Sequence, residues 1–359
     1  MSPNPPPVTI TGIGSVSPYG PVAGLIPQNS LKPTSITAWT TAGPRRAFLV
    51  PSFRPADVVP GIKTRRLDRL SVWCLVASSL AFKDAGIDLN QVDRSRVAVV
   101  FATAFGCVEL TEAFYLSAAA NGWNGTDPAT FPETLASAPA SHVSMFHRLR
   151  GPNITVSNKY FAGESAILQA ASLLRQRQAD LAIVLAGDAL ARTLYSWYEE
   201  ANLLSSACLD SDPVSEAAGF IPSEGVAALV MESSARVDLR PGARSYARIN
   251  AGRWTSGGKA TEMIQQMLGG SAPSLTICSG NGAPCATSST ATLARDIAGD
   301  RASIIPPQLF AQGLAGTGAL FHLILGLNNK RVGHPGTGQS LFLGTARDNG
   351  FAAILLELS

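Results

Sequence analysis

The sequence has 359 residues, of which 46% are hydrophobic and only 15% are charged. That length can bury a large core, either in one composite domain or in two domains, and the composition is that of a globular protein. The 28 Lys and Arg residues nearly balance the 25 Asp and Glu residues, which leaves a net charge of +3. So small an excess argues against a nucleic-acid partner or an anionic membrane surface.

Apolar runs such as those at 181–185 and 351–356 are far shorter than the roughly 20 residues of a membrane helix, so we expect no membrane-spanning segment. The start MSPNPPPVTITG has neither a basic leader nor an apolar h-region, which predicts a cytoplasmic protein. The 5 cysteines are scattered and form no CxxC pair. They predict reduced thiols, with no disulfide framework and no metal site, and we expect no cofactor.

Strands and helices alternate along the first two-thirds of the chain. A β-branched strand begins at Val8, and the Pro- and Ser-rich segment 20–60 is expected to be loop. Residues 65–87 have apolar side chains at helical spacing and end at Gly86, which predicts a helix. A polar, Gly-containing stretch separates the next strand from the following helix. The further elements expected here are strands at 96–106, 151–157, 180–189 and 225–233 and helices at 136–149 and 162–178.

The alternation resumes after Pro241 and predicts a second, shorter α/β half. Helices are expected at 258–268 and 288–298, strands at 274–280 and 350–359, and a segment of small residues at 312–327. Alternating strands and helices with near-continuous apolar strands favour an α/β fold with buried sheets. We therefore expect one composite domain made of two halves, 1–237 and 238–359.

Three segments resemble the β-ketoacyl synthases, the condensing enzymes of fatty-acid and polyketide assembly. They are VTITGIGSVSPYG, GPNITVSNKYFAGESAILQAASLLRQRQADLAIVLAGDAL and AAGFIPSEGVAALVMES. Their order and spacing extend the resemblance over nearly the whole chain. It implies the thiolase fold, a five-layered α/β/α/β/α sandwich of two duplicated halves. It also implies a dimer, because in that family the strand matching 153–157 pairs across a two-fold interface.

The resemblance also implies that the catalytic cysteine is absent. The family places it in the pattern TVSTACASG at the start of a buried helix, where the helix dipole lowers the thiol pKa. Here the same frame reads TVSNKYFAG from Thr155 to Gly163, which puts Tyr160 at the cysteine position. A phenol with a pKa of about 10 is mostly protonated at neutral pH, so Tyr160 is a poor nucleophile.

Two family histidines that polarise the thioester carbonyl are also replaced in this alignment. The family's HGTGT frame puts Asn281 at the first histidine position, and GHxxGAAGA puts Gln312 at the second. The family lysine before the second histidine has no counterpart between Ile304 and Phe310. We therefore expect no catalytic residue among these positions. With Phe161, the three replacements Tyr160, Asn281 and Gln312 are expected to line the acyl pocket.

Several alternatives remain open for these residues. Tyr160 either shapes a shared tunnel or fills a disused pocket, and Asn281 and Gln312 either donate hydrogen bonds to a carbonyl or satisfy buried polar groups. Cys278 and Cys285 flank the Asn281 region as substitute thiols or as small core residues.

Other motifs point to structure more than to chemistry. Residues 333–340 approach the P-loop spacing, but Gln339 stands at the lysine position and LFLGTA after it is typical of a strand. Glu224 matches the glutamate of the family's GEGAG and is interpreted as structural. Arg65, Arg66 and Arg69 form one small basic patch, either for an acidic carrier protein or as a solvated helix start.

Within this family, synthase-like chains without the cysteine pair with an active synthase and help to set chain length; they are called chain-length factors. Those subunits typically carry glutamine at the cysteine position, where this chain has Tyr160. The sequence therefore predicts a degenerate subunit that pairs with an active ketosynthase in fatty-acyl, polyene or polyketide biosynthesis, with an acyl carrier protein as a further partner. The alternatives are an acyl-transfer enzyme with a non-standard residue set and a homodimer that binds acyl groups or their carrier protein.

Overall fold

The structure is a computed structural model, and each of its strands belongs either to one large sheet or to a small two-stranded one. It describes residues 6–27, 31–40, 45–205, 219–256, 259–279, 290, 292–297, 303–305, 309–329, 338–345 and 350–359. The small sheet pairs β3 (Thr34–Ile36) with β4 (Arg45–Ala47). In the large sheet, β2 (Gly20–Ala23) pairs with β1 (Val8–Ser17) outside the main strand order.

The large sheet consists of two five-stranded sets with the same topology. The first set has the order β1, β8, β7, β5, β6, and the second has the order β9, β13, β12, β10, β11. In both sets the first and second neighbouring pairs are antiparallel and the third and fourth are parallel. The further strands are β5 (Val97–Thr103), β6 (Asn153–Ser157), β7 (Leu181–Asp188), β8 (Gly225–Ser233), β9 (Ala247–Ser256), β10 (Leu275–Ser279), β11 (Ser303–Ile305), β12 (Gln339–Thr345) and β13 (Gly350–Leu358).

If the five strands of each set are numbered as they occur along the chain, their order across the sheet is the same in both sets: first, fifth, fourth, second, third. Repetition of one strand order and of every strand direction confirms the expected duplication. The sets join where the start of β1 pairs antiparallel with β9, at Val8 with Ile249. The expected boundary at 237/238 falls in the short helix α7 (Ser234–Asp238), between the last strand of one set and the first of the next. The exact division stays a prediction.

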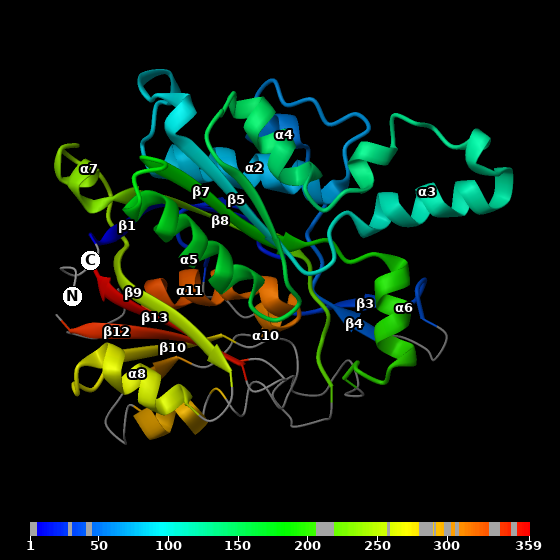
Figure 1. The fold of residues 1–359 in the computed structure, drawn as a ribbon. Helices are drawn as coiled ribbons and strands as arrows, with labels where there is room; N and C mark the ends of the chain where they lie inside the picture. The colour runs from blue at the N-terminus through cyan, green and yellow to red at the C-terminus, as the bar shows by residue number, and fades with distance from the viewer. Residues whose placement is uncertain are drawn as a thin grey trace.

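Helices complete five layers (Figure 1). α2 (Arg69–Asp84) and α4 (Ala138–His147) cover the outer face of the first strand set. α5 (Ala162–Arg175) and α11 (Ala319–Asn329) pack against each other between the two sets. α8 (Ala260–Leu268) lies on the outer face of the second set. The expected five-layered thiolase sandwich is therefore confirmed.

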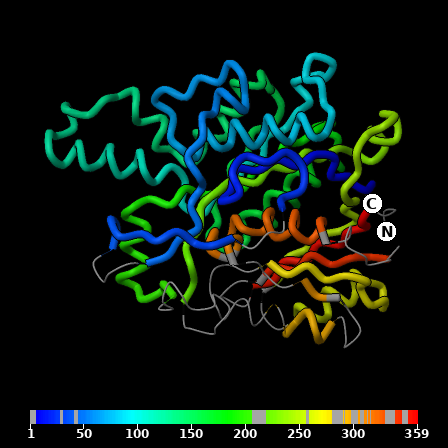
Figure 2. The backbone as a smooth tube through the Cα atoms, turned by 180° about the vertical axis from the view of Figure 1, so that it is seen from behind, coloured from blue at the N-terminus to red at the C-terminus, as the bar shows by residue number. Residues whose placement is uncertain are grey.

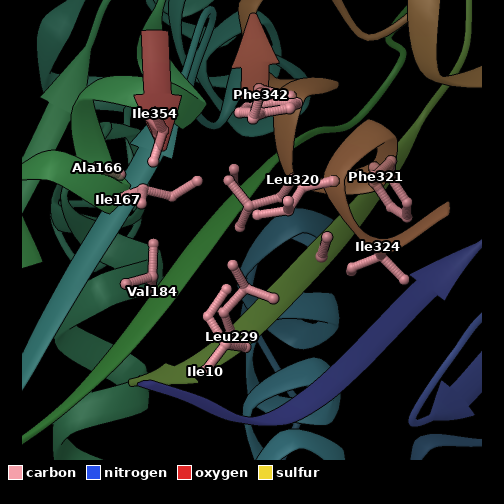
Figure 3. Packing of buried hydrophobic residues seen from close by; sticks show 14 of the residues in the cluster. Ile10, Ala166, Ile167, Val184, Leu229, Leu320, Phe321, Ile324, Phe342 and Ile354 are labelled. Carbon is pink, nitrogen blue, oxygen red and sulfur yellow. The ribbon is translucent and has the colours of Figure 1, made fainter. Parts of the chain in front are cut away.

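The central strands bury both faces, which explains their continuous apolar sequences. On β5, Val97, Val99 and Phe101 belong to the outer core under α2 and α4, whereas Ala98, Val100 and Ala102 belong to the inner core. In that inner core, Ile167 of α5 and Leu320 of α11 lie between Val184 and Leu229 of one set and Phe342 and Ile354 of the other (Figure 3). The inner core therefore takes side chains from both halves.

Individual residues determine where α2 begins and ends and how closely it packs on β1. Asp68 caps the helix by accepting a hydrogen bond from the Leu70 N–H at 2.8 Å, and Gly86 follows the helix with φ of +63°. The expected helix therefore begins at Arg69, four residues later than predicted. Gly14 lets the backbones approach closely, because a Cβ there would lie 2.3 Å from the Ala77 carbonyl oxygen.

The segment 20–60 that was expected to be loop contains the short strands β2, β3 and β4, because a Pro- and Ser-rich composition gives no clear strand periodicity. Three longer elements were also missed by sequence reasoning. α3 (Val108–Asn121) occupies the stretch expected to be polar loop, and it projects from the body as an arm (Figures 1 and 2). α6 (Arg192–Glu200) and β9 were also not predicted. The remaining short helical elements are α1 (Pro55–Val58), α10 (Leu309–Gln312), η1 (Leu89–Gln91), η2 (Arg94–Arg96), η3 (Trp123–Gly125), η4 (Phe131–Thr134) and η5 (Ala315–Thr317).

Other expected elements are confirmed with shifted ends. Within the expected helix 288–298, residues 290 and 292–297 are helical. β12 begins at Gln339, so a strand stands where a P-loop would require a helix. Among the described residues, no helix has the length and apolar character needed to cross a membrane.

Candidate functional site

The turn before α5 brings Tyr160 and Phe161 against the second half of the chain. Asn158 Oδ1 accepts hydrogen bonds from the backbone N–H groups of Tyr160 at 3.0 Å and Phe161 at 3.4 Å. Both aromatic residues are half-buried. The carbonyl oxygen of Lys159 accepts a 2.9 Å hydrogen bond from the N–H of Gly316, so η5 packs directly on this turn.

The other expected site positions are described only in part. Gln312 is the last residue of α10 and directly precedes Gly313, whose carbonyl accepts a 3.2 Å hydrogen bond from the Ser223 N–H. Asn281 and Cys285 lie outside the described residues. The structure therefore brings the segment that contains Gln312 close to the Tyr160 turn, and the expected acyl-pocket lining stays a prediction.

Asp188 is a buried carboxyl that joins the two halves at this site. It accepts hydrogen bonds from the hydroxyls of Thr103 and Thr317 and from the N–H groups of Ala104 and Phe105. Thr317 belongs to the second half, and its Oγ1 lies 2.9 Å from Asp188 Oδ2. Burial raises the pKa of Asp188 to about 6, although each of these hydrogen bonds acts to lower it.

Glu164, in the first turn of α5, is a second buried carboxyl at the junction. Its Oε1 accepts a 2.7 Å hydrogen bond from the Ser279 hydroxyl at the end of β10, whereas its Oε2 has no hydrogen-bond partner among the described residues. Burial raises its pKa to about 7. Gly344 of β12 makes room for it, because a Cβ there would lie 2.2 Å from Oε1. Sequence reasoning missed both carboxyls, since Asp188 ends an otherwise apolar strand and Glu164 is one of several polar residues of an amphipathic helix.

Glu224 ties three segments together and has the structural role that the sequence suggested. Its carboxylate accepts hydrogen bonds from the backbone N–H of Val50 at 3.0 Å and of Leu190 at 3.1 Å, and it pairs with Arg69 at 3.1 Å. Burial raises its pKa, while the charge of Arg69 opposes that rise. Arg69 also pairs with Glu109, so the expected basic patch keeps only Arg65 and Arg66 as exposed side chains.

The described cysteines are poor nucleophiles. Cys74, Cys107 and Cys278 are all buried free thiols. Burial raises the pKa of Cys278 to about 12 and that of Cys74 well above its ordinary value. A thiol must ionise to attack a thioester, so none of the three suits the substitute role considered for Cys278.

Exposed aromatic and aliphatic side chains gather on the arm and on α6. Lys159 Nζ lies 6.0 Å from the ring centroids of Phe105 and Trp197, close to the Tyr160 turn. Trp197 is 49% exposed, Leu116 on the arm is 61% exposed, and Trp123, two residues after the arm, is 68% exposed. The described part of the chain contains no cluster of three or more metal-ligating side chains.

A family model described as "Beta-ketoacyl synthase, N-terminal domain" matches residues 23–236, more than half of the chain. Among curated relatives, "3-oxoacyl-[acyl-carrier-protein] synthase 2" of Vibrio cholerae serotype O1 is 26% identical over 255 residues. That match covers 67% of this chain and 61% of the relative, so the chain aligns with about three-fifths of the relative's length.

Solved structures match almost the whole chain at low identity. "The ishigamide ketosynthase/chain length factor" has a TM-score of 0.78 at 19% identity and covers 98% of this chain and 99% of that one. A type II PKS acyl-carrier protein in complex with its ketosynthase bound to the hexaketide (AntDE:AntF) has a TM-score of 0.75 at 16% identity, with 99% of both chains covered. These structural matches show the ketosynthase fold, and with the family match they show that the chain belongs to the β-ketoacyl synthase family.

Proposed function

We propose that this chain is a synthase-like subunit that does not itself condense acyl groups and that pairs with an active β-ketoacyl synthase. It would serve fatty-acyl, polyene or polyketide biosynthesis by forming part of the acyl tunnel and influencing chain length. The observation that carries the proposal is Tyr160, which stands two residues before α5, where the family's cysteine is expected. A phenol there leaves the growing chain without a thiolate to hold it.

The described chemistry around α5 supports a non-condensing role. The described thiols are buried with raised pKa values, so they offer no alternative nucleophile. Asp188 and Glu224 accept several hydrogen bonds within the fold, which is the pattern of structural carboxylates. The scaffold is thus retained beside a turn that lacks the family's nucleophile.

The edge strand β6 favours the proposal that a second subunit adds a strand to the sheet. β6 ends the strand order and pairs only with β5 among the described strands. Its five residues are half-buried or exposed, whereas every residue of β5 and β7 is buried. An edge of this kind presents free N–H and C=O groups to another strand, as the family's dimer would use them.

The exposed side chains of the α3 arm also favour the proposal of a second subunit. Of its 14 residues only Phe114 is buried, Tyr115 and Leu116 are exposed, and so is Trp123 in η3 directly after the arm. A short helix is marginal by itself in water and gains most of its stability from packing. Large exposed apolar side chains that gather on one such element are typical of an interaction surface.

The test is co-expression of this chain with the synthase encoded nearest to it, followed by mass determination of the complex and a malonyl-carrier condensation assay. We expect a one-to-one complex whose activity or product length depends on this chain. Leu116→Glu should prevent that complex without unfolding the chain, because Leu116 is 61% exposed. Leu239→Glu is the matched control. Leu239 directly follows α7, away from the α3 arm, and is 85% exposed, so this variant should leave assembly intact.

A chain that remains a self-dimer and never alters the synthase's products would contradict the partner-subunit proposal and favour an acyl-binding homodimer. Turnover of an acyl thioester by the isolated chain would instead favour an enzyme with a non-standard residue set. Tyr160→Ala separates the two roles of that side chain. It removes the ring, so it should change product length if Tyr160 shapes the shared tunnel and leave product length unchanged if Tyr160 fills a disused pocket.

A further inference from the structure

A surface pocket of about 390 Å³ lies at the end of the first strand set opposite the candidate site. It is lined by Arg94, Ser144, Met145, Arg148, Leu149 and Arg150. η2 leads into β5 and the segment after α4 leads into β6, so the pocket lies where these two parallel strands begin. Thr103 and Asp188 lie where β5 and β7 end. The seven residues of β5 separate the two ends by about 20 Å.

The charged side chains that line this pocket are all positive. Three of its lining residues carry guanidinium groups and none carries a carboxylate. Among the ion pairs of the described residues, none involves Arg94, Arg148 or Arg150. The neighbouring carboxylate of Asp93 accepts hydrogen bonds from the N–H and hydroxyl of Ser95, at 2.9 and 2.6 Å. These hydrogen bonds, and to a lesser extent the charge of Arg150, lower the pKa of Asp93, so Asp93 partly balances Arg150.

The guanidinium of Arg94 is already oriented. Its Nε donates to the Leu89 carbonyl at 3.0 Å and its Nη2 donates to Asn90 Oδ1 at 2.8 Å. The N–H of Arg150 donates to the Arg94 carbonyl at 2.8 Å, which fixes the two segments beside each other. A fixed guanidinium loses less conformational entropy when it binds a ligand. His147 nearby adds no charge at neutral pH, because burial and then the charge of Arg94 lower its pKa to about 4.

Arg148 occupies a backbone conformation that favours glycine. It ends α4 with φ of 56° and ψ of 37°, in the left-handed region. A cation at a helix C-terminus complements the helix dipole, and that effect explains one positive charge here. It does not explain three guanidiniums around one cavity, or an arginine kept where glycine would be unstrained.

We propose that this pocket binds an oxyanion and that its ligand is a small phosphate-bearing molecule. Arginine is suited to phosphate because its planar donors can bind two oxygens at once. Met145, which is 63% exposed, and Leu149 add apolar surface for the rest of such a molecule. The site is independent of the proposed pairing with a synthase, so either proposal can fail without the other.

The test titrates the full chain with inorganic pyrophosphate and inorganic phosphate at low salt, by calorimetry and by thermal unfolding. We expect pyrophosphate to bind more tightly than phosphate and to raise the Tm by about 2–4 °C near saturation. Arg94→Gln and Arg148→Gln should each weaken pyrophosphate binding by about tenfold, because each removes a charge-assisted pair of hydrogen bonds.

Arg148→Gly makes the test specific, since its effects on stability and on binding have opposite signs. Glycine relieves the left-handed backbone, so the Tm without ligand should rise, while pyrophosphate affinity should fall about tenfold. Arg177→Gly is the matched control, because Arg177 is exposed, has φ of 57° and does not line the pocket. It should also raise the Tm, and it should leave pyrophosphate affinity unchanged. Absence of pyrophosphate binding, or an equal loss of affinity in both glycine variants, would overturn the proposal.

Discussion

Glu164 places an acidic group in the inner core with one oxygen unpaired, which the surrounding structure tolerates best when the carboxyl is protonated. Burial raises its pKa from 4.5 to about 7. Between those values the folded chain holds a proton that the unfolded chain has lost. The stability that this group contributes is therefore fully present below pH 4.5 and is lost as the pH rises through about 7.

We therefore predict that the free energy of unfolding falls between pH 5 and pH 8 and that Glu164→Gln reduces this fall. The shift corresponds to at most about 3 kcal/mol. Glutamine keeps an oxygen for the Ser279 hydroxyl and cannot ionise. Urea unfolding at a series of pH values measures the effect. In the variant, Asp188 still contributes a fall, because burial raises its pKa to about 6. His147 opposes that fall, because burial lowers its pKa from 6.5 to about 4 and its contribution to stability grows with pH in that range. An identical pH profile in both proteins would contradict this account of Glu164.

The Arg69–Glu224 pair gives a second prediction at this scale. Glu224 is 1% exposed, so Arg69→Met would leave its buried carboxylate without a compensating charge. Because Arg69 is itself 35% exposed, we expect a loss of about 2 kcal/mol, less than for a fully buried pair. Glu109→Gln breaks the other ion pair of Arg69, and Glu109 is 54% exposed, so it should cost less than about 1 kcal/mol. Equal losses in the two variants would show that the pair with Glu224 stabilises the fold no more than the exposed pair with Glu109, and would contradict this prediction.

Sequence reasoning located Tyr160 because a nine-residue frame around it matches a family pattern. The same reasoning did not identify Glu164 or Asp188 as site residues. Neither belongs to a recognisable local motif, and the partners Ser279 and Thr317 are more than a hundred residues away in the sequence. Only the packing of one half on the other brings these groups together.

At the scale of elements, the contact between α2 and β1 depends on glycine at a close approach. Gly14→Ala would place a Cβ 2.3 Å from the Ala77 carbonyl oxygen and 2.5 Å from the Ala81 nitrogen, which are helix backbone atoms. Since these atoms cannot rotate away, we expect a destabilisation of about 3 kcal/mol, measured by urea unfolding.

Ser15→Ala on the same strand is the control for that variant. The Ser15 hydroxyl is buried and has no hydrogen-bond partner, so its removal should be neutral or stabilising by up to about 1 kcal/mol. A comparable loss in both variants would indicate that β1 tolerates no change at all, and would contradict the specific role assigned to Gly14.

Elements were predictable where the spacing of apolar residues agrees with residues that begin or end a helix or strand. α2, with its apolar spacing and closing glycine, and the buried strand β7 were found within a few residues of their ends. The α3 arm was not found, because 13 of its 14 residues lie outside the core and no single apolar face marks it as a helix. β9 was missed because polar residues such as Arg248 and Arg253 interrupt its apolar pattern.

At the scale of the molecule, the two strand sets repeat one topology and share one inner core. Contacts between the halves include Glu164 with Ser279 and Asp188 with Thr317, and a Cβ on Gly163 would lie 2.7 Å from that of Ala319. The order of elements suggested the duplication, and the resemblance implied one composite sandwich. The particular contacts between the halves could not be predicted, because they join residues that are far apart in the sequence.

This sharing predicts that the halves cannot fold separately. Fragment 1–237 would expose the inner faces of β5, β7 and β8, and fragment 238–359 would expose the apolar side of α11. We expect each fragment alone to lack dispersed amide signals in NMR spectra and the two to form a native-like complex when they are co-expressed. The intact chain should unfold in one calorimetric transition, with equal calorimetric and van't Hoff enthalpies. Two resolved transitions, or a folded fragment 1–237, would mean that the inner core stabilises each half independently and that the halves are true domains.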